Sequence, residues 1–193
     1  LIMDDDRIET LIDAAKNFKS FDVYTSAESI GKHGEFVRDG FEWDTWERNL
    51  FKLHESPNIR SVHIMMTISA LSVWTIDQFM DKIINWRKKF KHKEEFFMSV
   101  NILRFPSFQS INIIDKENKL AIADKIESAL NRNREYMIGW EANQYERVIT
   151  YLRDVDKSYE DTDVIENKHH DFKNFIEQYS VRREMPLDEY LPT

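Results

Sequence analysis

The sequence predicts an α/β fold with a parallel sheet, followed by a helical C-terminal part. Short runs of strand-forming residues alternate with segments in which apolar residues recur every three or four positions, as in amphipathic helices. The connections between the runs are long enough for crossover helices, which parallel neighbours require. Gly and Pro number 4 each in 193 residues, so helices should dominate and tight hairpins should be few.

The first half of the chain supplies the predicted sheet. Residues 4–18 have apolar residues on one helical face and three acidic residues at the start, where the helix dipole favours negative charge. A Gly-bearing loop is expected over 30–34, and a second helix places Trp43, Trp46, Leu50 and Leu53 on one side. Another helix opens at Thr75–Gln78, which has the capping-box spacing. The predicted strands are Phe21–Thr25, Val62–Ile68, which is apolar enough to be covered on both faces, and Phe96–Leu103.

Beyond Arg104 the pattern becomes helical. Residues 105–110 are predicted to form a loop and 111–114 a short extended piece, after which Asp115 caps a helix. Further helices are expected near 141–156 and 168–179. We therefore divide the chain into a sheet-forming part, 1–115, and a helical C-terminal extension, 116–193, that packs on it.

The chain opens with Leu1-Ile2-Met3, which run directly into Asp4 and a helical pattern. This arrangement is typical of the end of a buried strand that leads into a helix. We therefore expect at least one earlier strand upstream, and we interpret the chain as the C-terminal part of a larger protein.

Composition excludes several classes of protein. An apolar fraction of 41% with 13% aromatic residues is ample for a packed core. The net charge of −8 disfavours a nucleic-acid surface, and the basic run 87–93 is interpreted as a solvated helix end because two Glu follow it. The absence of cysteine excludes a disulfide scaffold and a thiolate metal site within the chain. There is no signal peptide and no apolar run of about 18 residues, so no membrane contact and a cytoplasmic location are expected.

The common catalytic motifs are missing. The six histidines do not form a metal-binding set, since the adjacent pair His169-His170 would point in different directions on a helix. The sequence has no Gly-x-Ser-x-Gly, no Gly-x-Gly-x-x-Gly and no phosphate-binding Gly-Lys-Ser or Gly-Lys-Thr.

Polar residues follow each predicted strand, where ligands bind in parallel α/β sheets. The three stretches are Thr25–Ser29, Thr67–Ser72 and Asn101–Arg104. They predict either a shared pocket or simple helix capping and turn formation. Arg38, twelve residues after Ser26, could grip a carboxylate or phosphate through two parallel hydrogen bonds. Alternatively it forms a surface pair with Asp39 or Glu42.

These residues resemble a known family. Ser26-Ala27-Glu28-Ser29-Ile30-Gly31, followed by Glu35-Phe36-Val37-Arg38-Asp39-Gly40, is similar to the "S-x-D/E-x-I-G … E-Y-I-R-x-G" segment of twitch-type radical SAM proteins. Later motifs follow in the same order, and together they span nearly the whole chain. They are Trp43 and Trp46 before Asn49-Leu50; Thr67-Ile68-Ser69-Ala70-Leu71-Ser72; Asn101-Ile102-Leu103 with Phe105-Pro106 and Ser110-Ile111; and Tyr179-Ser180-Val181-Arg182-Arg183 with Pro186 and Tyr190-Leu191-Pro192.

The resemblance implies an incomplete parallel (β/α) barrel of the radical SAM type. In the parent protein a [4Fe-4S] cluster, reduced by a partner protein, would cleave S-adenosylmethionine (SAM) and start radical chemistry on an unknown peptide or small metabolite. It implies that Ser26 and Arg38 bind the methionine carboxylate of SAM and that Glu28 lines the ribose side. Thr67, Ser69 and Asn101 would face SAM or substrate. Because the chain lacks cysteine, it would hold no cluster and be inactive alone.

A second hypothesis is a non-catalytic α/β module that binds or assembles with a partner. In that case the absence of cysteine is a property of the whole protein. Three cysteines at the cluster spacing upstream of Leu1 would favour the radical SAM interpretation, whereas a start codon near Leu1 would favour the module.

Overall fold

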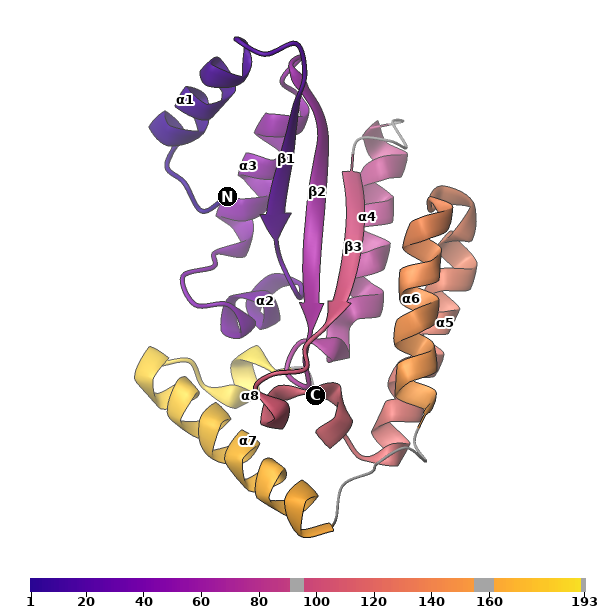
Figure 1. The fold of residues 1–193 in the computed structure, drawn as a ribbon. Helices are drawn as coiled ribbons and strands as arrows, with labels where there is room; N and C mark the ends of the chain where they lie inside the picture. The colour runs from indigo at the N-terminus through magenta and orange to yellow at the C-terminus, as the bar shows by residue number, and fades with distance from the viewer. Residues whose placement is uncertain (91–95, 155–161, 192–193) are drawn as a thin grey trace.

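The computed structural model describes residues 1–90, 96–154 and 162–191 and has an α/β architecture (Figure 1). The strands β1 (Phe21–Ser26), β2 (Ile59–Ile68) and β3 (Phe96–Ile102) form one sheet in the order β1-β2-β3. Both pairings are parallel. The predicted parallel α/β sheet is thus confirmed.

Helices α3 (Trp43–His54) and α4 (Ile76–Phe90) provide the crossovers and cover one face of the sheet, behind it in Figure 1. Aromatic rings dominate this interface, because each helix repeats large apolar residues every three or four positions on the side that faces the strands. Trp46, for example, lies 6.2 Å from Phe79 and 6.1 Å from Trp86 between ring centroids. The basic run 87–93 is only partly the solvated helix end that was predicted: Lys88 and Lys89 are exposed at the end of α4, but Arg87 is buried in an ion pair with Glu141. Residues 91–93 lie outside the described residues.

The other face of the sheet is open. Alternation along the strands places on it Tyr24, Ser26, His63, Met65, Thr67, Phe97, Ser99 and Asn101. We call this set the open face, because Tyr24, Met65, Thr67 and Asn101 are exposed; at its β3 end, Trp140 of the later helix stacks on Phe97. The prediction that Val62–Ile68 is covered on both faces is therefore wrong: Thr67 is exposed and Met65 is 37% exposed. The sequence did not indicate this exposed face, because methionine at position 65 is apolar and continues the apolar run.

Helix α6 (Gly139–Arg153) covers the outer edge of β3. Its Glu141 Oε1 accepts a hydrogen bond from the Met98 backbone N–H at 2.7 Å, and its Gln144 accepts one from Val100 N–H. Arg147 Nη2 donates to the Val100 carbonyl at 2.8 Å. Side chains thus satisfy the backbone groups that another strand would otherwise bind.

The C-terminal part is helical in the described residues. Helix α5 (Lys116–Asn133) packs against α4 and α6. Helix α7 (Thr162–Arg183) crosses below the carboxyl ends of the strands (Figure 1), and the short α8 (Leu187–Tyr190) contacts α2 (Gly31–Val37). None of the described helices is long and apolar enough to cross a membrane.

Three local predictions are wrong. Of the loop expected over 30–34, residues 31–34 belong to α2. A Cβ at position 34 would lie 2.7 Å from the Ser29 carbonyl oxygen, so glycine permits close packing there. Residues 111–113 form the 3-10 helix η3 rather than an extended piece, because the Ser110 side chain caps it.

Leu1–Met3 do not join the sheet: the Asn49 amide donates to the Leu1 and Met3 carbonyls and holds them beside α3. The remaining helix, α1, spans Asp5–Ala15.

Candidate functional site

The polar residues predicted at the strand ends converge at one edge of the sheet. Ser26 ends β1, and Thr67 pairs in register with Asn101 near the ends of β2 and β3. All three belong to the open face. Parallel strands bring their carboxyl ends together, which is the usual place for ligands in such sheets. The three residues therefore share one face and one edge of the sheet, although Ser26 and Thr67 line different cavities and Asn101 lines neither of the two.

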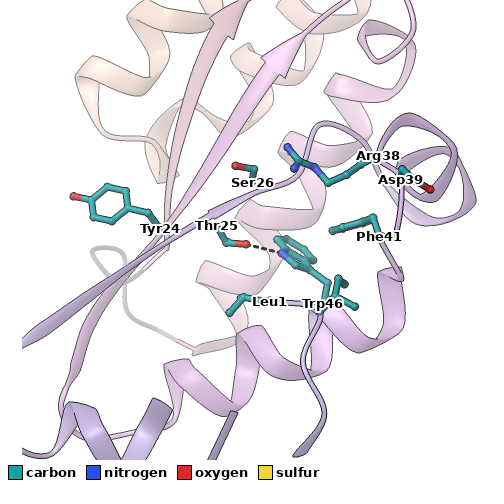
Figure 2. Close-up of a pocket in the computed structure, with 10 residues that line it drawn as sticks. Leu1, Tyr24, Thr25, Ser26, Arg38, Asp39, Phe41 and Trp46 are labelled. Atoms are coloured by element: carbon teal, nitrogen blue, oxygen red, sulfur yellow. Dashed lines mark hydrogen bonds between the residues drawn. The ribbon is translucent and has the colours of Figure 1, made fainter. Parts of the chain in front are cut away.

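Two neighbouring cavities lie at this edge. The first cavity, of about 350 Å³, is bounded by Leu1, Ile2, Tyr24, Thr25, Ser26, Arg38, Asp39, Gly40, Phe41 and Trp46 (Figure 2). The second cavity, of about 420 Å³, is bounded by Glu28, Val37, Arg38, Asp39, Thr67, Ser69, Leu103 and Gln109. Arg38 and Asp39 line both. Five of the six predicted site residues thus line these cavities; Asn101 lies beside Thr67 in the sheet.

Arg38 forms a bidentate ion pair with Glu28. Its Nε donates to Glu28 Oε2 at 3.0 Å and its Nη2 to Oε1 at 2.6 Å. The hydrogen bonds to Glu28 raise the pKa of Arg38 above its usual range. The Arg38 side chain is 43% exposed, whereas that of Glu28 is 9% exposed. The alternative of a surface pair with Asp39 or Glu42 is therefore wrong.

The pairing uses only one edge of the guanidinium. A guanidinium has five N–H donors, and the Nε–Nη2 edge is occupied by Glu28. Among the described residues, Nη1 of Arg38 makes no hydrogen bond, so the Nη1–Nη2 edge is available to a second planar anion. Glu28 thus fixes the position of Arg38 and leaves it able to bind a carboxylate in the bidentate manner.

Local structure positions Arg38 between the two cavities. The residue follows the end of α2 in an extended conformation, and Gly40 at φ 68° turns the chain back toward α3. Arg183 of α7 forms an ion pair with the neighbouring Asp39 at 3.0 Å. In the wall of the first cavity, Trp46 Nε1 donates to Thr25 Oγ1 at 2.9 Å (Figure 2). The Thr25 hydroxyl is therefore already used as an acceptor by a core side chain.

Other polar residues of these stretches act structurally. The Ser69 Oγ accepts a hydrogen bond from Ser72 N–H at 3.2 Å, and Ser72 Oγ accepts one from Ser69 N–H at 2.9 Å, which closes the turn after β2. Capping and turn formation therefore explain the hydroxyl of Ser69. In contrast, the hydroxyls of Ser26 and Thr67 have no hydrogen-bond partner within the described part of the chain.

Sequence reasoning missed a buried network beside the site. The Ser29 hydroxyl lies 2.7 Å from His33 Nδ1, the Thr75 hydroxyl lies within reach of both, and His33 Nε2 donates to the Leu71 carbonyl at 2.8 Å. Burial lowers the pKa of His33 and so favours its neutral imidazole. The network joins α2 to the segment that precedes α4. Ser29 and Thr75 lay in recognisable patterns, but nothing in the sequence linked either of them to His33.

A row of rings on the open face was also missed. It comprises Tyr24, His63, Phe97 and Trp140, each stacked on the next. The register places Tyr24 opposite His63 and His63 opposite Phe97. The period-two spacing of Ser61, His63, Met65 and Thr67 within an apolar run was the signal that could have revealed it.

The donor set does not suit a metal cluster. Among the described residues, no three His, Asp or Glu side chains are grouped to hold a metal ion, and the sequence contains no cysteine. His169 Nε2 contacts the Ile113 carbonyl instead of joining a metal set.

No protein-family model, curated protein or solved structure matches this chain.

Proposed function

We propose that this chain forms the carboxylate-binding side of a SAM site in a radical SAM protein with a partial (β/α) barrel. The observation that carries the proposal is Arg38, which is fixed by Glu28, has one edge free and lies with Ser26 on the first cavity. The order of motifs described above assigns the same two residues to the methionine carboxylate of SAM.

The chemistry of the site supports this role. A carboxylate bound by the free edge of Arg38 would form two charge-assisted hydrogen bonds, and the Ser26 hydroxyl is a third donor. Thr67, next to Asn101 in the sheet, lines the adjoining cavity and would contact the rest of the ligand. In this arrangement Glu28 is a positioning residue for Arg38, a role that adds to its proposed place near the ribose.

The [4Fe-4S] cluster does not fit this chain, because cysteine thiolates hold such clusters and the sequence has none. Its ligands would have to come from polypeptide outside these 193 residues. The proposal for this chain is therefore binding, and radical chemistry belongs to the parent protein. The parent would also need a reductant protein and a substrate of the peptide or small-metabolite class.

Binding is tested by titrating the ¹⁵N-labelled chain with SAM and, separately, with methionine. Both ligands should shift the backbone amide signals of Ser26 and Arg38, and Arg38→Gln should remove the effect because the bidentate donor is lost. Arg60→Gln is the matched control, since Arg60 makes the same kind of bidentate pair with Asp22 at the opposite end of the strands. No shift with millimolar ligand, or equal losses in both variants, would contradict the proposal.

A second candidate is the non-catalytic binding or assembly module. The observation that favours it is that Glu28 already neutralises the charge of Arg38 while the open face presents Tyr24 and Met65 to solvent. The complete gene product, reconstituted anaerobically with iron and sulfide, distinguishes the two. Formation of 5′-deoxyadenosine from SAM supports the first candidate, and its absence together with no cluster absorbance supports the second.

A further inference from the structure

The end of α7 reaches the segment that carries Arg38. Arg183, the last residue of α7, donates from Nη1 to the Phe36 carbonyl at 2.7 Å and from Nη2 to the Glu35 carbonyl at 2.9 Å. Both carbonyls belong to the last turn of α2, where backbone acceptors lack partners within a helix and a cation is favoured by the helix dipole. Arg183 therefore caps α2, although it lies 147 residues away from Phe36 in the sequence.

The third donor group of Arg183 is used on the other side of Arg38. Arg183 Nε lies 3.0 Å from Asp39 Oδ1 and forms an ion pair with it. Arg183 thus binds the chain both before Arg38 and directly after it. The Arg183 side chain is 14% exposed and that of Asp39 is 81% exposed, so the cation is the fixed member of the pair. Within the described part of the chain, no other cation pairs with Asp39.

Arg183 is itself held in place by aromatic packing. Its guanidinium lies over the Tyr179 ring at 4.7 Å from the centroid, and Tyr179 packs edge-on against the buried Phe36 at 5.4 Å and 87°. The short helix α8 adds an ion pair between Glu189 and Lys32 of α2. The C-terminal helices α7 and α8 therefore hold α2 close to the point where Arg38 leaves it (Figure 1).

Asp39 is a carboxylate that could compete with a ligand for Arg38. The two residues are adjacent in the sequence, and both line both cavities. Figure 2 shows their side chains pointing in opposite directions, with the Arg38 guanidinium toward Ser26 and the Asp39 carboxylate away from it. The Nη1–Nη2 edge of Arg38 suits a carboxylate of the protein as well as one of a ligand. A free anion beside the site would also repel a bound carboxylate.

We propose that Arg183 is a positioning residue for the carboxylate site: it holds Asp39 away from Arg38 and so keeps the free edge of Arg38 available to the ligand. The inference rests on the proposed function and adds to it a residue of α7 to which the sequence motifs gave no role. Glu28 and Arg183 then have complementary tasks. Glu28 fixes one edge of the Arg38 guanidinium, and Arg183 prevents the protein itself from occupying the other.

The test compares methionine binding by the ¹⁵N-labelled full chain, by Arg183→Gln, by Asp39→Asn and by the double variant. Arg183→Gln should weaken binding about fivefold, because the released Asp39 competes for Arg38 as an exposed ion pair. Adding Asp39→Asn should restore the affinity, since the double variant has the original net charge and no competing carboxylate; Asp39→Asn alone should not weaken binding. Arg182→Gln is the matched control, because it removes the same charge from an exposed neighbour, and it should leave the affinity unchanged.

The ligand-free chain gives a second readout. In the arginine side-chain ¹H–¹⁵N spectrum, the guanidinium signals of Arg38 should change in Arg183→Gln, because Asp39 then binds the Nη1–Nη2 edge. They should return to their original positions in the double variant. A residue that merely stabilised α2 would change these signals equally in both variants.

Each result decides one of the two claims. If Arg183→Gln weakens methionine binding and Asp39→Asn does not restore it, Arg183 only caps α2 and the inference is overturned. Unchanged affinity in Arg183→Gln overturns it as well. If methionine at millimolar concentration does not bind the unaltered chain, the proposed function fails, and the Arg38 signals alone decide whether Arg183 holds Asp39 away. Should Arg183→Gln fail to fold, Arg183→Lys, whose compact ammonium lacks the planar set of donors, is compared with and without Asp39→Asn.

Discussion

Replacing Glu141 by alanine should be among the most destabilising single substitutions in this protein. Glu141 is fully buried and forms an ion pair with Arg87, whose side chain is 1% exposed. Its carboxylate also accepts hydrogen bonds from the Met98 N–H at 2.7 Å and the Ile138 N–H at 3.0 Å. It thus joins α4, the edge of β3 and the start of α6.

The expected loss follows from what remains after truncation. Removing one partner of a buried ion pair costs about 3–5 kcal/mol, because the other charge stays buried without compensation. The alanine variant also leaves the buried Met98 N–H without its acceptor, and such an orphaned group costs about 1–3 kcal/mol. The two costs overlap, so we expect a loss of about 3–5 kcal/mol. Domains are stable by about 5–15 kcal/mol in total, so much of the stability would be lost.

Equilibrium urea unfolding measures this loss. Glu146→Ala is the matched control on the same helix: Glu146 pairs with Arg134, but the two side chains are 45% and 55% exposed. Exposed pairs contribute about 0–1 kcal/mol. If Glu141→Ala and Glu146→Ala lower the free energy of unfolding by similar small amounts, the reasoning about the covered β3 edge is refuted.

Three further outcomes are expected. Gly34→Ala should lower the free energy of unfolding by about 1–3 kcal/mol, because its Cβ would lie 2.7 Å from a backbone carbonyl oxygen; Gly139→Ala, with nothing within 4 Å, should be neutral or slightly stabilising in thermal unfolding. Burial lowers the pKa of His33, so below its ordinary value of 6.5 the unfolded chain binds a proton that the native state excludes. Stability should therefore fall as the pH falls below 6.5, and His33→Gln should reduce that slope in urea unfolding. Arg183 donates to two backbone carbonyls of α2, so Arg183→Ala should speed amide hydrogen exchange in α2, whereas Arg182→Ala, at an exposed neighbour, should not.

The sheet could be predicted because its signals are local. Strand-forming runs separated by crossover-length helices dictate parallel neighbours, and that prediction is confirmed. Helix α2 was missed because two glycines suggest a loop by propensity. Packing against the Ser29 carbonyl reverses that preference, since only glycine fits at position 34. Tertiary contacts of this kind leave no periodic pattern in the sequence.

The site shows the same division. The shared edge of Ser26, Thr67 and Asn101 follows from the rule that parallel strands end together, so position in the sequence was sufficient. The partner of Arg38 could not be predicted, because Glu28 and Arg38 lie in two connecting segments whose approach depends on how α2 packs. Asp39, the nearer candidate in sequence, pairs with Arg183 of α7 instead.

Side chains of α6 take the place of a further strand at the edge of β3. A strand edge exposes backbone donors and acceptors, which must be bound by something. At β3, Glu141, Gln144 and Arg147 bind them, and Trp140 stacks on Phe97. Because these contacts come from side chains on a helix far along the chain, no strand pattern in the sequence could predict them. The proposed ligand site rests instead on the strand ends, where Glu28 holds Arg38 at the first cavity.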